Sequence, residues 1–177
     1  MNKYCIFIHF LLFLKKIINA MEYNKVLIQK EGGSDADTAT VKDTVADFGV
    51  WCQDMPFNVG MEVKEPTVRD WKDEDGEDAY VGGGLRFSAY DMTVKWIAKG
   101  LKGSVRGRIS TFLRYLSGQD GSGVKMKLWC EWTGIGRQHV RLKKVEDNAT
   151  LDRCGDDEIV TFSTVFRVED PVTDIQL

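Results

Sequence analysis

The chain of 177 residues is 43% hydrophobic and 29% charged, which suits the core of one domain and excludes a disordered chain. Its net charge of −3 counts against a dedicated duplex-DNA-binding protein, because such proteins usually carry a net basic surface. Two His and four Cys without a C-x-x-C pair leave little for metal binding, so we expect no metal site and no cofactor.

Residues 1–20 differ in composition from the rest of the chain. An apolar run follows an early Lys and ends at a pair of Lys. The run is too short to span a bilayer, and no comparable run occurs later, so we expect no membrane partner. Three interpretations stay open: a signal-like segment, a mis-assigned start with translation beginning at Met21, and an amphipathic anchor. A single folded domain is expected over 21–177.

Short apolar or alternating runs, separated by Gly, Pro and charged residues, predict β-strands in the expected domain. These runs lie at 25–29, 48–52, 58–64, 85–98, 124–132, 138–145 and 159–168. The polar residues 31–47 predict a long arm, because the segment exceeds an ordinary hairpin loop. The charged stretch 66–78 is expected in solvent, since such residues are not buried without partners.

The stretch 104–117 is the one segment with a convincing helical period. Its apolar stripe consists of Val105, Ile109, Phe112, Leu113 and Leu116. Ser104 is expected to cap the start of this helix and Gly118 its end. The sequence therefore predicts a mainly β protein, an antiparallel β-sandwich or partly open barrel with one flanking α-helix at about 104–117.

Catalytic motifs are missing from the sequence. It contains no G-x-S-x-G and no phosphate-binding Gly pattern, and His139 is the single His after residue 20. The acidic run at 73–78 matches only part of a calcium-binding EF-hand loop. We therefore predict no catalytic or metal-binding residues and no enzyme activity.

Two groups of opposite charge are the candidate inter-subunit contacts. The acidic group is Asp73, Asp75 and Asp78, and the basic group is Arg106, Arg108, Arg114, Arg137 and Arg141. The ordinary interpretation of each group is a solvated surface. A basic patch with aromatic neighbours also suits nucleic-acid bases. A third interpretation is that the basic patch of one copy meets the acidic loop of the next, because opposite charges set register and partner choice at an interface.

The order of several motifs resembles the tail structural proteins of long-tailed bacteriophages. The charged loop WKDEDGEDAY precedes LRFSAYDMTVKWIAKG, the helix VRGRISTFLRYLSG, the strands in VKMKLWCEWTGIGRQHVRLKKV and the ending VTFSTVFRVEDPVTDI. The resemblance covers about residues 45–175. It is closest to the distal tail protein family and extends to tail-tube subunits, which share that core fold.

This resemblance implies a non-enzymatic virion structural protein that forms a ring in the phage tail. The ring is expected to be a homo-oligomer, typically a hexamer, that acts as a distal tail (baseplate) adaptor or as a tail-tube subunit. Its partners are then other copies and other tail proteins, with DNA passing non-specifically through the lumen. The protein would be made in the host cytoplasm and reside in the virion. The alternative is a secreted or surface β-sandwich binding module, which requires residues 1–20 to be a true signal.

Overall fold

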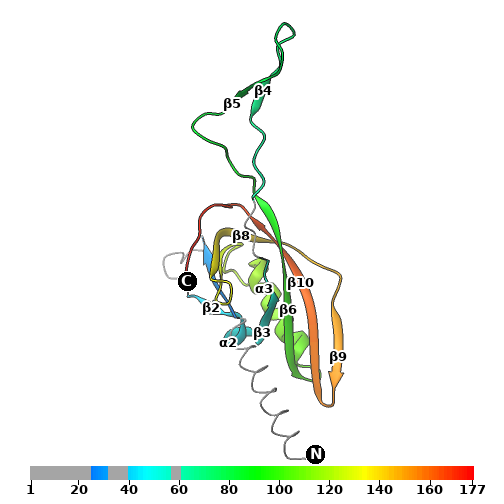
Figure 1. Cartoon of the computed structure of the whole chain (residues 1–177). Helices are drawn as coiled ribbons and strands as arrows, with labels where there is room; N and C mark the ends of the chain where they lie inside the picture. Colours follow the sequence, from blue (N-terminus) through cyan, green and yellow to red (C-terminus); the bar gives the residue numbers. More distant parts are fainter. Residues whose placement is uncertain (1–24, 32–39, 57–60) are drawn as a thin grey trace, which may run out of the picture.

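The computed structural model describes residues 25–31, 40–56 and 61–177, and the predicted leader lies outside these ranges. In chain order the elements are β1 (Val26–Glu31), β2 (Lys42–Asp43), α2 (Thr44–Phe48), β3 (Val50–Asp54), β4 (Thr67–Arg69), β5 (Asp78–Tyr80), β6 (Tyr90–Leu101), α3 (Val105–Ser117), β7 (Lys125–Cys130), β8 (Ile135–Val145), β9 (Thr150–Cys154) and β10 (Asp157–Val168) (Figure 1). The predicted fold class is confirmed: the chain is mainly β, with one main helix close to the expected 104–117.

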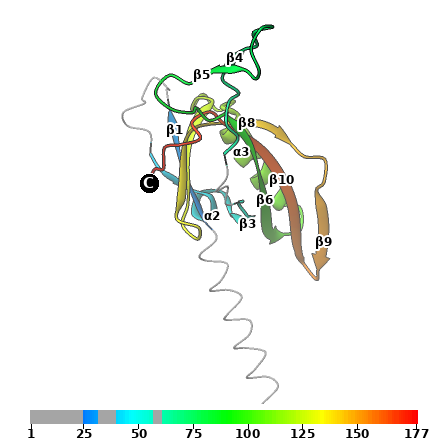
Figure 2. The same cartoon turned by 45° about the horizontal axis from the view of Figure 1, so that its top comes forward.

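One antiparallel sheet of eight strands forms the body of the molecule. The strand order is β2-β1-β7-β8-β10-β6-β3, and β9 pairs with β10 beside this path. The long strands β6 and β10 lie side by side, and the sheet curves around α3 (Figures 1 and 2). Because β2, α2 and β3 follow one another directly, the segment 42–54 links the two outer strands of the sheet. The sheet is therefore a partly open barrel, not a closed one.

The core lies between the curved sheet and α3. Strand β6 alternates as predicted, with Met92, Val94, Trp96 and Ala98 buried. The ring of Phe112 is fully buried, and its centroid lies 5.1 Å from that of Trp96. The Trp96 indole N–H donates to the Thr164 hydroxyl at 2.7 Å, so this buried polar group is satisfied.

The predicted apolar stripe of α3 divides into two parts. Val105, Phe112 and Leu116 are buried in the core, as expected. Ile109 and Leu113 are only partly buried and sit at the margin of the core. This part of the stripe therefore remains accessible to a ligand or another chain.

The two predicted caps of α3 have different outcomes. Gly118 adopts a left-handed backbone with φ of 73°, and the N–H groups of Gly118 and Gln119 donate to the last-turn carbonyls. Ser104 occupies the N-cap position as predicted, but its side chain does not cap the helix. Its backbone is helical, and its hydroxyl donates to the Leu101 carbonyl at 2.7 Å instead of accepting from the helix. A capping side chain needs an extended backbone to reach the helix N–H groups.

The expected polar arm 31–47 is also corrected. Residue 31 ends β1, and the segment 42–48 holds β2 and α2, while residues 32–39 lie outside the described part. Asp43 caps α2 by accepting from the N–H groups of Val45 at 2.7 Å and Ala46 at 3.1 Å. Phe48 at the end of α2 is buried against Phe112. The second half of the expected arm therefore forms regular structure that packs against the core.

The boundaries of several predicted strands shift as well. Residue 48 belongs to α2, so the strand predicted at 48–52 is β3 at Val50–Asp54. The strand predicted at 85–98 starts only at Tyr90, as β6. Of the strand predicted at 58–64, residues 58–60 lie outside the described part, and the rest forms a single bridge between Val63 and Phe87. Strand β9 and the short hairpin β4–β5 were not predicted.

Candidate assembly interface

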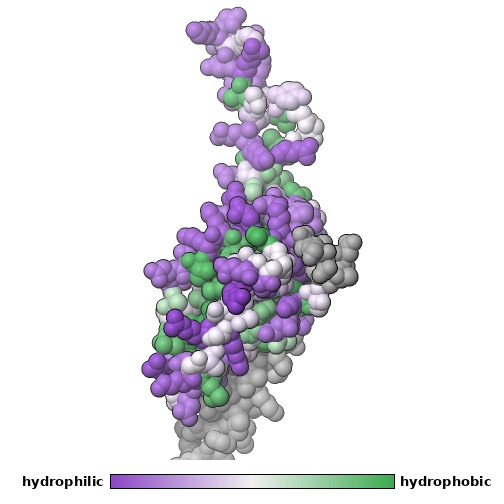
Figure 3. All heavy atoms as spheres, turned by 180° about the vertical axis from the view of Figure 1, so that it is seen from behind, coloured by the Kyte–Doolittle hydropathy of each residue, from purple (hydrophilic) through white to green (hydrophobic). Residues whose placement is uncertain are grey.

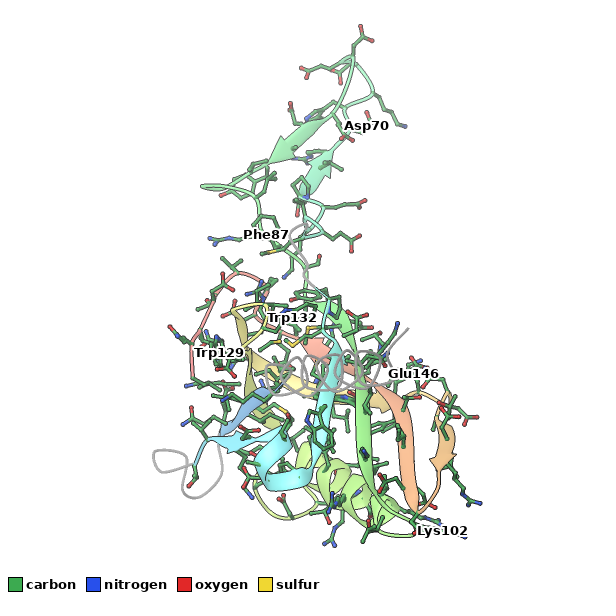
Figure 4. The ribbon with its side chains drawn as sticks, turned by 60° about the horizontal axis from the view of Figure 1, so that its bottom comes forward. Asp70, Phe87, Lys102, Trp129, Trp132 and Glu146 are labelled. Carbon is green, nitrogen blue, oxygen red and sulfur yellow. The ribbon has the colours of Figure 1, made fainter. Side chains whose placement is uncertain are left out.

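The charged stretch that was expected in solvent forms a projecting hairpin. Strands β4 and β5 pair only with each other, and the hairpin extends away from the sheet (Figure 1). Two backbone hydrogen bonds hold its base, from Lys64 N to Arg86 O at 2.7 Å and from Ser88 N to Glu62 O at 2.8 Å. Figure 4 places Phe87 at this base and Asp70 near the far end.

This hairpin, residues 67–80, carries a concentrated negative charge. Its carboxylates are Asp70, Asp73, Glu74, Asp75, Glu77 and Asp78, against two cations, so its net charge is −4. All of these residues are exposed, and none forms an ion pair within the described residues. Arg69, one of the cations, stacks on the Trp71 ring at 4.1 Å. We call this segment the acidic hairpin.

Apolar side chains are exposed along the acidic hairpin and its base. Tyr80 is 79% exposed, and Val68, Trp71 and Leu85 are also exposed. Seen from behind, the far end of the projection is hydrophilic, while hydrophobic residues gather nearer the body (Figure 3). A projection that combines carboxylates with uncovered apolar groups has the mixed character of a contact surface.

A groove of complementary character runs between α3 and β8. It has a volume of about 450 Å³. Its apolar lining comes from Ile109 and Leu113 of α3 and from Leu142 and Val145 of β8, and Arg106 and Arg114 also line it. Neither arginine forms an ion pair in the part of the chain that the structure describes. We call this feature the α3–β8 groove.

The five arginines of the predicted basic patch do not lie together. Arg106 and Arg114 line the α3–β8 groove, whereas the Arg108 guanidinium donates to the Lys99 carbonyl at 3.2 Å. Arg137 is only 5% exposed, forms an ion pair with Asp174 and donates to the Tyr90 hydroxyl. Arg137 therefore has an internal structural role.

The basic side chains along β8 are paired with nearby carboxylates. Arg141 Nε lies 3.0 Å from a carboxylate oxygen of Glu169, and Lys143 Nζ lies 2.5 Å from one of Asp91. The hydrogen bond from Lys143 is the main cause that lowers the pKa of Asp91. The positive charge on this side of the sheet is thus largely neutralised within the molecule. Arg106 and Arg114 differ from these side chains, because neither forms an ion pair within the described residues and both line the α3–β8 groove.

The acidic hairpin projects away from the body that carries the α3–β8 groove. Figure 4 shows Asp70 at one extremity of the molecule and Lys102, which lies just before α3, at the other. No hydrogen bond or ion pair joins the two features within the described residues. The acidic hairpin and the α3–β8 groove are therefore separate surface features of one chain.

No protein-family model matches the chain, and no curated protein matches it either. Within the ranges that the structure describes, no helix is long and apolar enough to cross a membrane. The same residues contain no group of three or more His, Cys, Asp or Glu side chains arranged to hold a metal ion.

The helical period of 104–117 predicted Ile109 and Leu113 in the core and did not reveal the α3–β8 groove. Their helical spacing is shared with the buried residues of α3, so periodicity alone could not separate them. A weak signal was present, because Arg106 lies about one helical turn before Ile109 and about two turns before Leu113, so the three share a helix face. This mixture of apolar and cationic residues on one helix face indicates a margin of the core.

Proposed function

We propose that the protein is a non-enzymatic virion structural protein that assembles from identical copies into a ring of the phage tail. It would act as a distal tail (baseplate) adaptor or as a tail-tube subunit, in contact with other tail proteins. The observation that carries this proposal is the pair of unpartnered complementary features, the acidic hairpin and the α3–β8 groove, on one chain.

Complementary features at different places on one chain favour a head-to-tail contact. In such a contact each copy uses its hairpin on one neighbour and offers its groove to the other. Heterologous contacts of this kind generate closed rings when the rotation between copies closes, and open filaments when it does not. The motif resemblance to tail proteins supports the closed form, with six copies as the expected number.

Exposed sheet edges support the same proposal. Strands β2 and β3, at the two ends of the sheet order, each pair with one neighbour within the described residues, so each presents a second edge. Edge strands invite pairing with other chains, and a ring subunit can use them where a monomer must protect them. The curved sheet would then contribute main-chain contacts, while the charged features set the register between copies.

The proposal is tested by measuring the oligomeric state of the protein translated from Met21. Light scattering and negative-stain microscopy at increasing concentration should reveal rings. Neutralising the hairpin with Asp73→Asn, Asp75→Asn and Asp78→Asn should raise the dissociation constant about fivefold, since the two groove arginines can form two exposed ion pairs of about 0.5 kcal/mol each. The melting temperature of the monomer should be unchanged, because these carboxylates form no ion pair with any other residue that the structure describes.

A matched control neutralises three exposed carboxylates on the body, with Asp147→Asn, Asp152→Asn and Asp156→Asn, which also lack ion pairs in the described structure. This control changes the net charge equally and should assemble like the parent protein. Assembly that survives the hairpin changes, or falls equally in the control, would remove the role of the acidic hairpin. Separate expression of all 177 residues in a secreting host tests the alternative, and a monomer cleaved near residue 20 would support the secreted binding module.

A further inference from the structure

The tip of the acidic hairpin, residues 70–77, carries a single apolar side chain, that of Trp71. The Trp71 side chain is exposed, and the Arg69 guanidinium lies over its ring at 4.1 Å from the centroid. The Trp71 carbonyl accepts a hydrogen bond from the Glu74 N–H at 3.3 Å, which closes a turn at the tip. A side chain that is already held in place loses little freedom on binding, so this indole suits an anchor.

The α3–β8 groove has an apolar centre with a cation toward each end. Arg106 and Arg114 are eight residues apart on α3, which separates their backbones by roughly 12 Å along the helix axis. Ile109 and Leu113 come between them in the helix, and β8 supplies further apolar lining. The groove volume of about 450 Å³ exceeds that of one indole ring. The groove can therefore receive an aromatic side chain between two cations.

The tip of the acidic hairpin repeats this order of groups with the opposite charge. Asp70 directly precedes Trp71, and Asp73 follows two residues later. Three residues of extended chain span at most about 10 Å, so the two carboxylates flank the indole at a separation that two Arg side chains on α3 can match. Interfaces commonly combine an apolar centre with a charged rim, and Trp is enriched among the residues that dominate their affinity. The matching order favours entry of the tip into the groove.

We propose that Trp71 is the anchor by which the acidic hairpin docks in the α3–β8 groove of a second copy. The indole packs against Ile109 and Leu113, and the carboxylates beside it pair with Arg106 and Arg114. The occupant is another copy, because the hairpin extends away from the body of its own chain and no ion pair joins the two features within the described residues (Figure 4). This docking rests on the proposed function and assigns most of the affinity to the buried indole.

Loss of the anchor should weaken the contact between copies more than loss of one charge. Trp71→Ala should raise the dissociation constant about 30-fold, which is typical of a central aromatic residue in an interface. Asp70→Asn should raise it about twofold, because an exposed ion pair contributes little. The matched control is Trp132→Ala, since Trp132 is also exposed but lies in the turn between β7 and β8. This control should associate like the parent protein.

A mixing experiment with two complementary variants of the full chain tests the docking directly. The groove-blocked variant, Arg106→Glu with Arg114→Glu, keeps its hairpin, whereas the anchor-free variant, Trp71→Ala with Asp70→Asn, keeps its groove. Each variant alone should sediment as a monomer, and an equimolar mixture should form a one-to-one complex, because one intact hairpin then meets one intact groove. Urea unfolding checks that both variants fold, and Arg106→Gln with Arg114→Gln replaces the groove-blocked variant if charge reversal prevents folding.

Three outcomes would overturn the docking. The first is a mixture that forms no complex while the parent protein assembles, in which case the proposed ring uses other surfaces. The second is an equal effect of Trp71→Ala and Trp132→Ala on association. The third is a parent protein that stays monomeric at every concentration, which overturns the proposed ring as well. A one-to-one complex in the mixture, together with open filaments of the parent protein, would support the docking and refute the ring.

Discussion

Replacing Phe112 by Ala removes the aromatic ring at the centre of the core. This ring has no exposed surface, and its centroid lies 5.3 Å from that of Phe48, 5.1 Å from Trp96 and 6.4 Å from Phe162. Truncating a buried Phe costs about 3–5 kcal/mol, because apolar burial is lost and a cavity remains. Since a domain of this size is stable by about 5–15 kcal/mol, we expect a large loss that leaves little reserve.

The neighbouring substitution Leu113→Ala is the matched control. Leu113 belongs to the same predicted stripe, but it is only partly buried and lines the α3–β8 groove. Because the α3–β8 groove is already open to solvent, truncating the Leu113 side chain leaves no closed cavity. We expect a loss of about 1 kcal/mol, from the part of its side chain that contacts the core.

Urea unfolding followed by tryptophan fluorescence distinguishes the two variants. Phe112→Ala should lower the midpoint strongly and Leu113→Ala slightly, with unchanged slopes, because a change in midpoint alone reports stability. Equal losses in the two variants would refute the reasoning, since they would place both side chains in the same environment. A wild-type midpoint for Phe112→Ala would remove α3 from the core altogether.

Further predictions concern three local features. Burial lowers the pKa of Lys30 from 10.5 to about 8, so the unfolded chain binds more protons between these pH values. As the pH rises through that window, the unfolding free energy of the wild type should therefore increase relative to that of Lys30→Met, by up to about 3 kcal/mol. A difference between the two proteins that does not change with pH would contradict this. In Gly118→Ala the new Cβ would lie 2.5 Å from the Gly123 carbonyl oxygen, so denaturant unfolding should report a larger loss than for Gly121→Ala, which has a positive φ and open space. Asp43→Ala should cost about 1 kcal/mol in the same assay by removing the cap of α2, and an unchanged midpoint would exclude that role.

The regular elements were predictable where local pattern and burial agree. Strand β6 alternates between core and solvent over its length, and α3 places its apolar residues on one face. Both patterns follow from the geometry of the backbone and require no information about distant residues. Strand β10 was also found, although the burial of Ser163 and Val165 on its second face was not expected. That second face is covered in part by the loop after β8, where Asn148 donates to the Ser163 hydroxyl.

The short elements were missed because distant contacts stabilise them. The segment around Thr44 is polar and resembles a loop, yet the Thr44 hydroxyl accepts from the Val26 N–H at 3.1 Å and is buried. Likewise, β9 exists because it pairs with β10, and its own sequence lacks a clear alternating pattern. Such elements depend on which partner strand lies nearby, and that is decided by the assembled sheet.

The fold class, the position of the main helix and the strongly acidic segment are predictable from the sequence, because they follow from periodicity and composition. Which charged groups have a partner within the molecule depends instead on residues that folding brings together. Arg137 and Arg106 are the same residue type, but Arg137 is neutralised by Asp174, 37 residues further along the chain, while Arg106 lines an open groove.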